Sequence, residues 1–395
     1  MSVNQLSKQV FIVDALRTPV GSPNKSLKNF SVTQLSSLVI KEIVQRNKIK
    51  KQLIDEVILG NTVSAGTGQN FARQAVILSG LPENVPAYTV NNVCGAGLQS
   101  VILAARSILS GQAHLVVTGG VESVSHCPQL ISGNKQEDGQ EQRFFDSLLH
   151  DGLFCQITGK RMGELCEDMA EEYGITREEQ DLFALESHRK ACAAQDQKKF
   201  LKEVVSCPVS ANKVFVDKDE RPRKNISLGI LVSLPPAFRK GGTITAGNSS
   251  VPADGAGAFV LASKDMVKKL KMQPKARILG YVSIALNPQR VFEAGISAIQ
   301  KCLHQCQLSV QDIDLFEISE AFAAQAILTK NRLKILDKKM NIWGGDIALG
   351  HPLGAAGTRI LVTLMHALID QKKKRGLACV CLGGGGAVAV VVEVI

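Results

Sequence analysis

The sequence is poor in aromatic residues, which make up 5% of its 395 positions and include one tryptophan and three tyrosines. It also lacks the patterns of a metal site. None of its ten cysteines has a partner at the two-residue spacing of a zinc knuckle, and no set of carboxylates or histidines has metal-ligand spacing. We therefore expect no metal and no disulfide framework, and we expect eight of the ten cysteines to be reduced core thiols in a cytoplasmic protein.

Signals for targeting and for membrane insertion are missing as well. The apolar residues 10–13 are too few for a signal peptide and are followed at once by Asp14 and Arg17. Residues 377–395 are apolar, but four consecutive glycines interrupt them, so this stretch is predicted to be strand, turn and strand rather than a membrane span. The chain does not end in a peroxisomal tripeptide. These features predict a cytoplasmic protein without membrane contact.

The formal net charge of +10 raises the question of nucleic-acid binding. The basic runs at 48–51, 268–271 and 372–375 are scattered and have no interleaved aromatic residues. This pattern is typical of a solvated surface, so no nucleic-acid partner is expected. An anionic substrate is a second use for the surplus charge, and four basic residues in the middle of the chain could attract one: Lys218, Arg221, Arg223 and Lys240.

Cys94 stands between an extended approach and an apolar run, 98–109, that is predicted to be a helix. A helix start offers unpaired backbone N–H groups and the positive end of the helix dipole, and both stabilise a thiolate over a thiol. We expect the small residues Gly95, Ala96 and Gly97 to leave room for a substrate carbonyl. A lone cysteine is nevertheless more often a small core residue, so the rest of the chain has to decide its role.

The C-terminal third supplies two more reactive groups. His351 lies in a glycine-rich turn before an apolar helix predicted at 358–369, and Cys381 ends a predicted strand just before the glycines 383–386. A thiol that attacks a carbonyl needs a base, and a neutral imidazole in a loop can serve. Two cysteines and a histidine, each embedded in glycine, indicate a chemical site rather than simple packing.

The remaining histidines and the glycine run have plainer interpretations. His114 and His366 are expected to be structural, and four others are expected at the surface: His126, His150, His188 and His304. The glycines 383–386 are followed by a β-branched stretch, 387–392, which predicts a strand instead of a phosphate-binding helix. This order argues against a dinucleotide site, and with it against an NAD-dependent oxidoreductase.

The chain contains a small unit twice, about 260 residues apart. Residues 94–97 precede a predicted helix and then an apolar strand that ends in glycines, and residues 351–354 do the same. Two similar halves would present their loop residues to one shared cleft. Alternating strands and helices predict an α/β fold with buried sheets. The mid-chain segment differs: it has charged clusters and one amphipathic helix, 177–194, with a Thr176/Glu179 capping box, and is predicted to be an insertion.

Together with residues 17–21 and 245–250, these blocks resemble the thiolase family, the acetyl-CoA acetyltransferases and 3-ketoacyl-CoA thiolases, from about position 10 to 392 and in the family's motif order. The resemblance implies a five-layered αβαβα fold built from two similar halves with an inserted loop domain. We expect the N-terminal half at 1–123 and 253–273, the loop domain at 124–252 and the C-terminal half at 274–395.

The same resemblance implies an acyl-CoA C-acyltransferase that condenses two acetyl-CoA molecules reversibly or cleaves 3-ketoacyl-CoA with CoA. Cys94 is similar to the acylated nucleophile, His351 to its base, and Cys381 to the group that handles the α-proton. The oxyanion donors would be the backbone of Cys94 and Gly383 and a water held at Ser319. The resemblance further implies contacts with the substrate and CoA at Met162, Arg223, Phe238, Ala246, Ser250 and Phe322. CoA would be substrate rather than cofactor, in a homodimer or homotetramer of fatty-acid metabolism.

Three departures from the family pattern touch the acyl or pantetheine pocket. Ser319 replaces an asparagine, Arg161 replaces a histidine of the short-chain members, and residues 291–295 replace a Met-Gly-x-Gly-Pro segment. Because a serine hydroxyl is shorter than an amide, we expect a slower enzyme that Ser319→Asn accelerates. Two alternatives stay open: a condensing enzyme of low activity or altered specificity, and a non-catalytic acyl-CoA-binding relative. A ketoacyl synthase is disfavoured, because Cys381 stands where a second histidine is expected.

Overall fold

The computed structural model describes residues 9–131, 143–209 and 214–395. Nine strands are hydrogen-bonded in the order β13-β14-β15-β12-β1-β11-β4-β2-β3. Five belong to the N-terminal half: β1 (Val10–Arg17), β2 (Glu56–Gly60), β3 (Ala87–Val90), β4 (Leu115–Glu122) and β11 (Gly255–Ser263). Four belong to the C-terminal half: β12 (Ala276–Ala285), β13 (Leu315–Ile318), β14 (Arg375–Leu382) and β15 (Gly386–Val394). The halves join where β1 pairs with β12 over two positions, Phe11 with Arg277 and Ile12 with Ala276.

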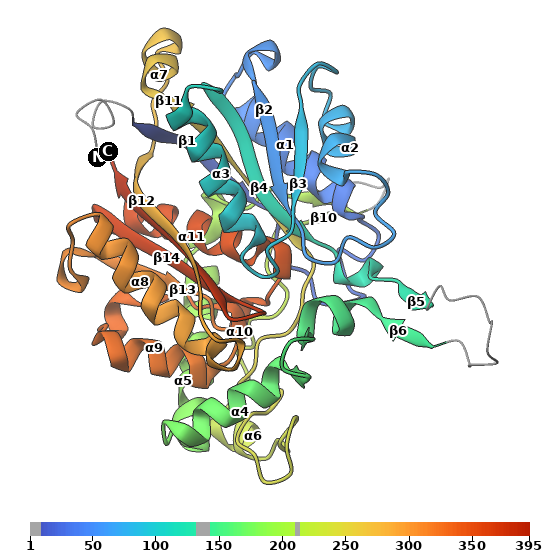
Figure 1. The fold of residues 1–395 in the computed structure, drawn as a ribbon, viewed down its shortest axis with the longest axis vertical. Helices are drawn as coiled ribbons and strands as arrows, with labels where there is room; N and C mark the ends of the chain where they lie inside the picture. The colour runs from blue at the N-terminus through green and yellow to red at the C-terminus, as the bar shows by residue number, and fades with distance from the viewer. Residues whose placement is uncertain (1–8, 132–142, 210–213) are drawn as a thin grey trace.

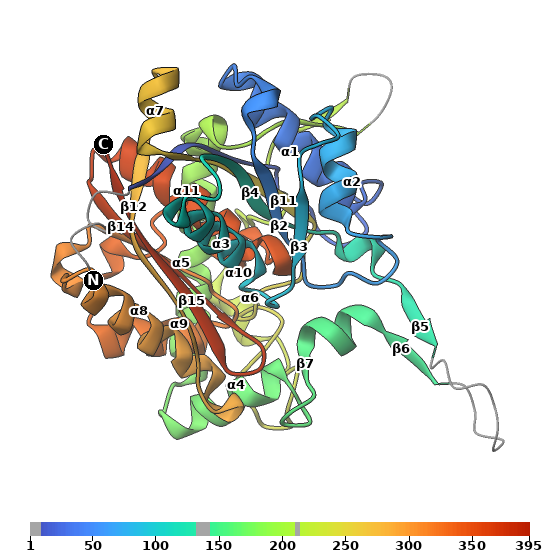
Figure 2. The same cartoon turned by 45° about the horizontal axis from the view of Figure 1, so that its top comes forward.

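Helices divide this strand system into layers (Figures 1 and 2). Helices α3 (Ala96–Ser110) and α11 (Ala356–Asp370) contact each other and strands of both halves. The outer face of the N-terminal strands is covered by α1 (Val32–Arg46) and α2 (Phe71–Leu78). The outer face of the C-terminal strands is covered by α8 (Ala294–Gln305), with α9 (Ala323–Leu333) beside it. The predicted αβαβα arrangement is therefore confirmed.

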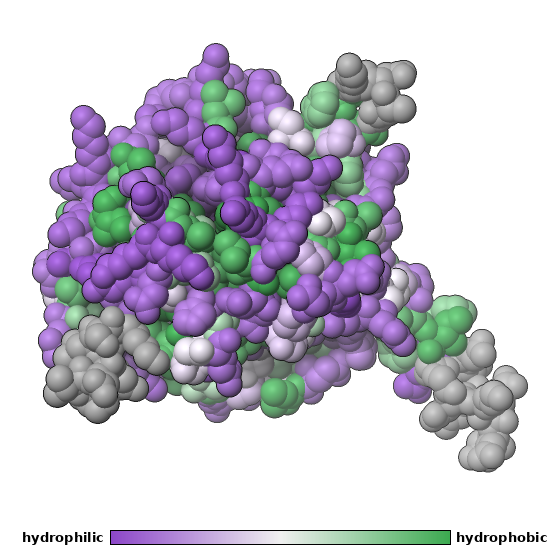
Figure 3. Space-filling view, turned by 90° about the horizontal axis from the view of Figure 1, so that it is seen from above, coloured by the Kyte–Doolittle hydropathy of each residue, from purple (hydrophilic) through white to green (hydrophobic). Residues whose placement is uncertain are grey.

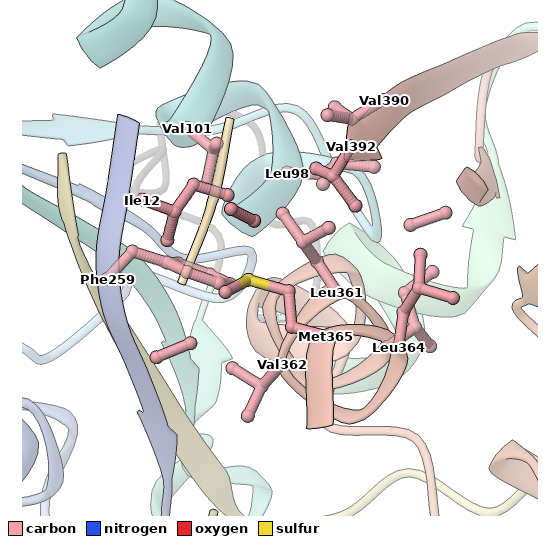
Figure 4. Packing of buried hydrophobic residues seen from close by; sticks show 14 of the residues in the cluster. Ile12, Leu98, Val101, Phe259, Leu361, Val362, Leu364, Met365, Val390 and Val392 are labelled. Carbon is pink, nitrogen blue, oxygen red and sulfur yellow. The ribbon is translucent and has the colours of Figure 1, made fainter. Parts of the chain in front are cut away.

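The two central helices are apolar around most of their circumference, as a helix between two sheets must be. Figure 4 shows Leu361 and Met365 of α11 packed among Leu98 of α3, Phe259 of β11 and Val392 of β15. By length and composition alone, Val93–Ser110 and Leu353–Asp370 could cross a membrane, but they are the segments of these two helices and are 56% and 89% buried. Their hydrophobicity is accounted for by the core.

The two halves repeat one topology. The neighbours β1-β11-β4-β2 in one half correspond to β12-β15-β14-β13 in the other, and in each half the pair at the far end of this set is parallel, β2 with β4 and β13 with β14. Helix α3 leads into β4, and α11 leads into β14. The internal repeat predicted from the sequence is confirmed, and it places the start of α3 and the start of α11 side by side in the centre of the molecule.

Between β4 and β11 the chain forms the inserted segment. Its helices are α4 (Met162–Glu172), α5 (Arg177–Asp196) and α6 (Leu228–Val232), and its short strands are β5 (Gln129–Ile131), β6 (Phe144–Asp146), β7 (Phe154–Cys155), β8 (Lys160–Arg161), β9 (Cys207–Pro208) and β10 (Phe215–Val216). The predicted capping box at Thr176 is present at the start of α5, which packs on α9 and on α10 (Asp346–Leu349). Helix α7 (Lys264–Leu270) follows β11. The β5–β6 hairpin projects from the body (Figure 2).

The surface is largely hydrophilic, and one histidine that was expected there is buried. The face in Figure 3 is mostly hydrophilic with scattered apolar groups. The prediction that His188 lies at the surface is wrong. Its side chain is 3% exposed on the buried face of α5, where Nδ1 accepts a hydrogen bond from the backbone N–H of Arg223. Burial, reinforced by the nearby charges of Arg223 and Arg221, lowers the pKa of His188 to about 4.

Candidate active site

A cavity of about 240 Å³ lies where the two halves meet the inserted segment. The three groups singled out from the sequence, Cys94, His351 and Cys381, all line it. Apolar side chains supply most of the remaining wall: Leu149, Leu153, Met162, Phe238, Val291, Phe292, Ala321, Phe322 and Leu382. Three rings of that wall, Phe238, Phe292 and Phe322, meet edge to face with centroids 5.5 and 6.0 Å apart. The cavity thus joins reactive polar groups to a largely apolar chamber.

Cys94 occupies a tight turn between β3 and α3. Val93 has a φ of 47°, which is unusual for a β-branched residue, and backbone hydrogen bonds run from Gly95 N–H to the Asn92 carbonyl and from Ala96 N–H to the Val93 carbonyl. The turn places the half-buried thiol two residues before the first helical residue, Ala96, with Gly95 as the N-cap between them. The predicted position at a helix start is confirmed, and the hydrogen bonds of the turn hold Val93 in its strained conformation beside the thiol.

The glycines beside Cys94 serve a different purpose from the one predicted. A Cβ atom added to Gly95 would lie 2.5 Å from Leu382 Cδ2, and one added to Gly97 would lie 2.3 Å from Thr358 Oγ1. Both positions face the C-terminal half at close range. The expectation that these two glycines leave room for a substrate carbonyl is therefore wrong; they let the halves approach closely enough for Cys94 and His351 to share one cavity.

His351 is fixed by its backbone on both sides. Gly350, with a φ of 100°, ends α10, and the next residue donates its N–H to the Val251 carbonyl while its own carbonyl accepts from Ala253 N–H. The imidazole is 5% exposed and bonds the side chain of Cys94. Burial disfavours the imidazolium, but the negative charge of a Cys94 thiolate and the contact with Asp346 outweigh it and raise the pKa of His351 to about 10. The imidazole is therefore placed to take up the proton of the Cys94 thiol.

Cys381 reaches the same cavity from the end of β14. Its side chain is 6% exposed, and burial, with the nearby charge of Cys94, raises the pKa of its thiol far above the ordinary range. The two cysteines therefore differ in chemistry. Cys94 has a base in contact with it, whereas Cys381 is held in its protonated form as a proton donor. Gly383, at the turn that follows, also lines the cavity.

Ser319 does not lie where its predicted role requires. It is 1% exposed, it is not among the residues that line the cavity, and its hydroxyl donates a 2.5 Å hydrogen bond to Asp346 Oδ2. That same oxygen lies 3.3 Å from His351 Nδ1. Because the hydroxyl is already engaged behind the imidazole, this geometry gives no support to a water-holding oxyanion role for Ser319.

The six predicted contacts with substrate and CoA fall into two groups. Met162, Phe238, Ser250 and Phe322 line the cavity. Arg223 and Ala246 are exposed on the inserted segment, outside the cavity lining. Arg161, noted as a departure, borders the cavity with its guanidinium bonded to Glu164 and stacked 5.4 Å from the Phe238 ring centroid.

Two further residues of the site were not predicted from the sequence. Asp346 and Arg359 are 0% and 2% exposed, and Arg359 Nη2 lies 2.8 Å from Asp346 Oδ1. Burial alone would raise the pKa of Asp346, but Arg359, His351 and Ser319 together hold it below its usual range. The available signal was the position of Asp346, five residues before His351 across the Gly350 turn. That spacing has no regular periodicity and was not recognisable without the fold.

The site offers no further set of ligands for a metal. Within residues 9–131, 143–209 and 214–395, no group of three or more His, Cys, Asp or Glu side chains could hold an ion. All ten cysteines are free thiols. What the arrangement can do is covalent: a nucleophilic thiol with its base, and a second thiol that carries a proton, face one chamber.

Comparisons with known proteins give matches over nearly the whole chain. The model of the thiolase N-terminal domain matches residues 10–265, and that of the thiolase C-terminal domain matches residues 272–394. Acetyl-CoA acetyltransferase of Escherichia coli K12 is 46% identical over 393 residues, which cover 98% of this chain and 99% of the relative. A probable acetyl-CoA acyltransferase of Staphylococcus aureus COL is 42% identical over 389 residues, with 98% and 99% coverage. The crystal structure of human mitochondrial 3-ketoacyl-CoA thiolase in complex with CoA superposes with a TM-score of 0.95 at 37% identity, covering 99% of each chain.

Proposed function

This chain belongs to the thiolase family and is an acyltransferase of that class; we propose that it interconverts two acetyl-CoA molecules with acetoacetyl-CoA and CoA through an acyl-Cys94 intermediate. The observation that carries the proposal is the convergence of Cys94, His351 and Cys381 on one cavity. The identity to an acetyl-CoA acetyltransferase supports the choice of the acetyl group.

In the first half-reaction Cys94 takes up an acyl group. The proton of the Cys94 thiol passes to His351, the sulfur attacks the thioester carbonyl carbon, and the carbonyl π pair moves onto oxygen. The backbone N–H groups of Cys94 and Gly383 are the proposed donors to that oxygen. When the carbonyl re-forms, the bond to the CoA sulfur breaks, and the departing thiolate takes the proton from His351. The products are acyl-Cys94 and free CoA.

In the half-reaction that forms or breaks the carbon–carbon bond, which is the second during condensation and the first during cleavage, Cys381 transfers the α-proton. During cleavage of acetoacetyl-CoA, Cys94 attacks the keto carbon, the bond between the keto carbon and the α-carbon breaks, and the α-carbon takes a proton from the Cys381 thiol. Burial keeps that thiol protonated, which is the form cleavage needs. By microscopic reversibility the Cys381 thiolate removes the same proton during condensation. No redox step occurs in either direction.

The chamber favours a short acyl group. Its volume of about 240 Å³ lies below the roughly 300–1,000 Å³ of pockets that enclose drug-sized ligands, and it has to hold the acyl group together with the end of the pantetheine arm. Phe292 and Phe322 form part of its wall and meet edge to face. CoA is proposed to reach the cavity across the inserted segment, past Met162, Phe238 and Ser250, with Arg223 and Ala246 contacting its outer part.

Exposed apolar side chains support an oligomer. Strand β3 ends the nine-strand order, and near that edge Tyr88 is 50% exposed and Leu78 is 55% exposed. On the projecting β5–β6 hairpin Ile131 is 53% exposed and Phe144 is 68% exposed. We propose a homodimer through the β3 edge and a homotetramer through the hairpins, in the cytoplasm and in fatty-acid metabolism. Light scattering of the wild type and of Phe144→Ser tests the contact between hairpins. We expect a tetramer for the wild type and a dimer for the variant.

Substrate assays test the reaction itself. We expect thiolysis with a series of 3-ketoacyl-CoA substrates to give the highest kcat/KM for acetoacetyl-CoA and a steady fall as the chain lengthens. A maximum at six or more acyl carbons would overturn the chain-length proposal while leaving the thiolase class intact. Binding of acyl-CoA without turnover of any member of the series would instead favour the non-catalytic alternative.

A further inference from the structure

Beyond the cysteines and the histidine, we propose that Asp346 is a positioning residue of the reaction, completing a Cys94–His351–Asp346 relay in which its carboxylate holds His351 in the tautomer that accepts the Cys94 proton. The inference rests on the proposed function of this site and adds a group to it. Asp346 opens α10 and is fully buried, and Oδ2 faces the imidazole Nδ1 at 3.3 Å. With Nδ1 turned toward a carboxylate, Nε2 is the nitrogen left for Cys94.

The carboxylate is built to stay charged and fixed. Oδ1 accepts from Arg359 Nη2 at 2.8 Å. Oδ2 accepts from the Ser319 hydroxyl at 2.5 Å and from Glu320 N–H at 3.1 Å. Two anchors on Oδ2 and one on Oδ1 leave the carboxylate little freedom to rotate. Such a buried, hydrogen-bonded carboxylate can orient an imidazole and stabilise the imidazolium that forms when the thiol gives up its proton.

A purely structural role accounts less well for the arrangement. An ion pair between Asp346 and Arg359 alone would satisfy Oδ1 and leave the imidazole free to rotate. Instead the oxygen that carries the serine and backbone anchors is the one aimed at His351. The 3.3 Å separation is long for a hydrogen bond, which is common for catalytic pairs in the absence of substrate.

The titratable groups around Asp346 and His351 allow the effect of Asp346 on the imidazole to be separated from a general loss of a buried acidic group. The groups that face Asp346 and His351 are Cys94 before α3, Arg359 on α11, Glu320 after β13 and Cys381 on β14. Glu317 on β13 lies against the other terminal nitrogen of the same guanidinium, 3.7 Å from Arg359 Nη1. Glu317→Gln is therefore a matched control, because it changes a buried acidic side chain next to Arg359 and leaves Asp346 and its contact with the imidazole in place.

The test measures the rate of Cys94 acetylation by acetyl-CoA in a single turnover, and the pH of half-maximal alkylation of Cys94 by iodoacetamide. In Asp346→Asn the amide can donate to Nδ1, which places the imidazole proton on Nε2, where it blocks transfer from the thiol. We expect acetylation to slow by about 10²-fold, less than the roughly 10⁴-fold seen when the same change is made in a serine triad, because a thiol is the stronger acid. We expect the alkylation midpoint to move up by about one pH unit.

Glu317→Gln should keep the wild-type midpoint. Ser319→Ala, which keeps the carboxylate and removes one of its donors, should move the midpoint slightly down, because a less saturated carboxylate attracts the imidazole proton more strongly. This variant tests the relay even if Asp346→Asn does not fold. A wild-type rate and midpoint in folded Asp346→Asn, an unchanged or raised midpoint in Ser319→Ala, or an equal shift in Glu317→Gln would each overturn the inference. Absence of acetylation in the wild type would instead contradict the proposed function.

Discussion

The Glu122 carboxylate on β4 accepts a 2.9 Å hydrogen bond from the backbone N–H of Gly354, which lies three residues beyond His351. The same carboxylate accepts from the backbone of Thr62 and Val63 and from the Asn61 amide. One buried side chain thus joins the N-terminal half to the loop that carries the catalytic base. The loop that follows His351 is therefore tied to the half that carries Cys94.

We therefore predict that Glu122→Gln lowers both the stability and the activity of the protein. An amide can accept at one oxygen only, so at least one buried N–H group loses its partner, at about 1–3 kcal/mol. We expect the unfolding free energy in urea to fall by about that amount and kcat to fall several-fold, with KM for acetoacetyl-CoA nearly unchanged. Glu56→Gln, on the neighbouring strand and away from the cavity, is the control for loss of a carboxylate. Unaltered stability in Glu122→Gln would show that the bridge contributes nothing.

Because of Glu317, we predict that the free energy of unfolding falls as the pH rises. Burial, only partly offset by Arg359, raises the pKa of Glu317 to about 8, above its ordinary value of 4.5. Between those two pH values the folded protein holds a proton that the unfolded chain releases, so stability falls as pH rises through this window. Each pH unit contributes at most about 1.4 kcal/mol. Relative to wild type, Glu317→Gln should become progressively more stable from about pH 5 to 8 in urea titrations; parallel curves would contradict this prediction.

Substitutions of His351 and of Cys381 should slow different half-reactions. His351→Ala removes the base of Cys94 and should slow acetylation of the enzyme by roughly 10²–10⁴-fold. Cys381→Ser keeps that base and should acetylate at nearly the wild-type rate, while overall thiolysis and condensation fall by a similar factor. Rapid-quench measurement of enzyme-bound acetyl distinguishes the steps. If both variants lose acetylation to the same extent, the assigned division of roles is wrong.

Ser319→Asn should lower turnover, in contrast to the increase expected from the sequence alone. The side chain is 1% exposed and already engaged by Asp346, so a larger amide has to displace its neighbours, at about 1–3 kcal/mol. We expect reduced kcat and a lower melting temperature. Ser319→Ala serves as the control for loss of the hydroxyl without added volume. A faster enzyme with asparagine at this position would restore the oxyanion interpretation of Ser319.

The sequence was sufficient to predict features that depend on local pattern. The capping box at Thr176, the helix after Cys94 and the strand pair around the glycines 383–386 are set by neighbouring residues and were found in place. The internal repeat predicted the paired halves, and the convergence of Cys94, His351 and Cys381 followed from the order of the motifs.

Features that depend on contacts between distant segments were missed or misread. The close approach of Gly97 to Thr358 joins residues from opposite halves, so the glycine resembled a substrate-binding feature. The hydroxyl of Ser319 is directed by Asp346, 27 residues further on. His188 lies among polar residues of α5, so the sequence indicated an exposed position. The backbone at Arg223 packs against it and buries it. In each case the deciding partner comes from another element of the fold.

Identification of the acetylated residue tests the account most directly. Purified protein is incubated with acetyl-CoA, quenched in acid and digested, and the peptides are sequenced by mass spectrometry, with Cys94→Ala and Cys381→Ser treated in parallel. We expect one acetyl group on Cys94 in the wild type and in Cys381→Ser, and none in Cys94→Ala. An acetyl group on Cys381 in place of Cys94, or one that persists at a single site in Cys94→Ala, would contradict the assignment of Cys94 as the nucleophile.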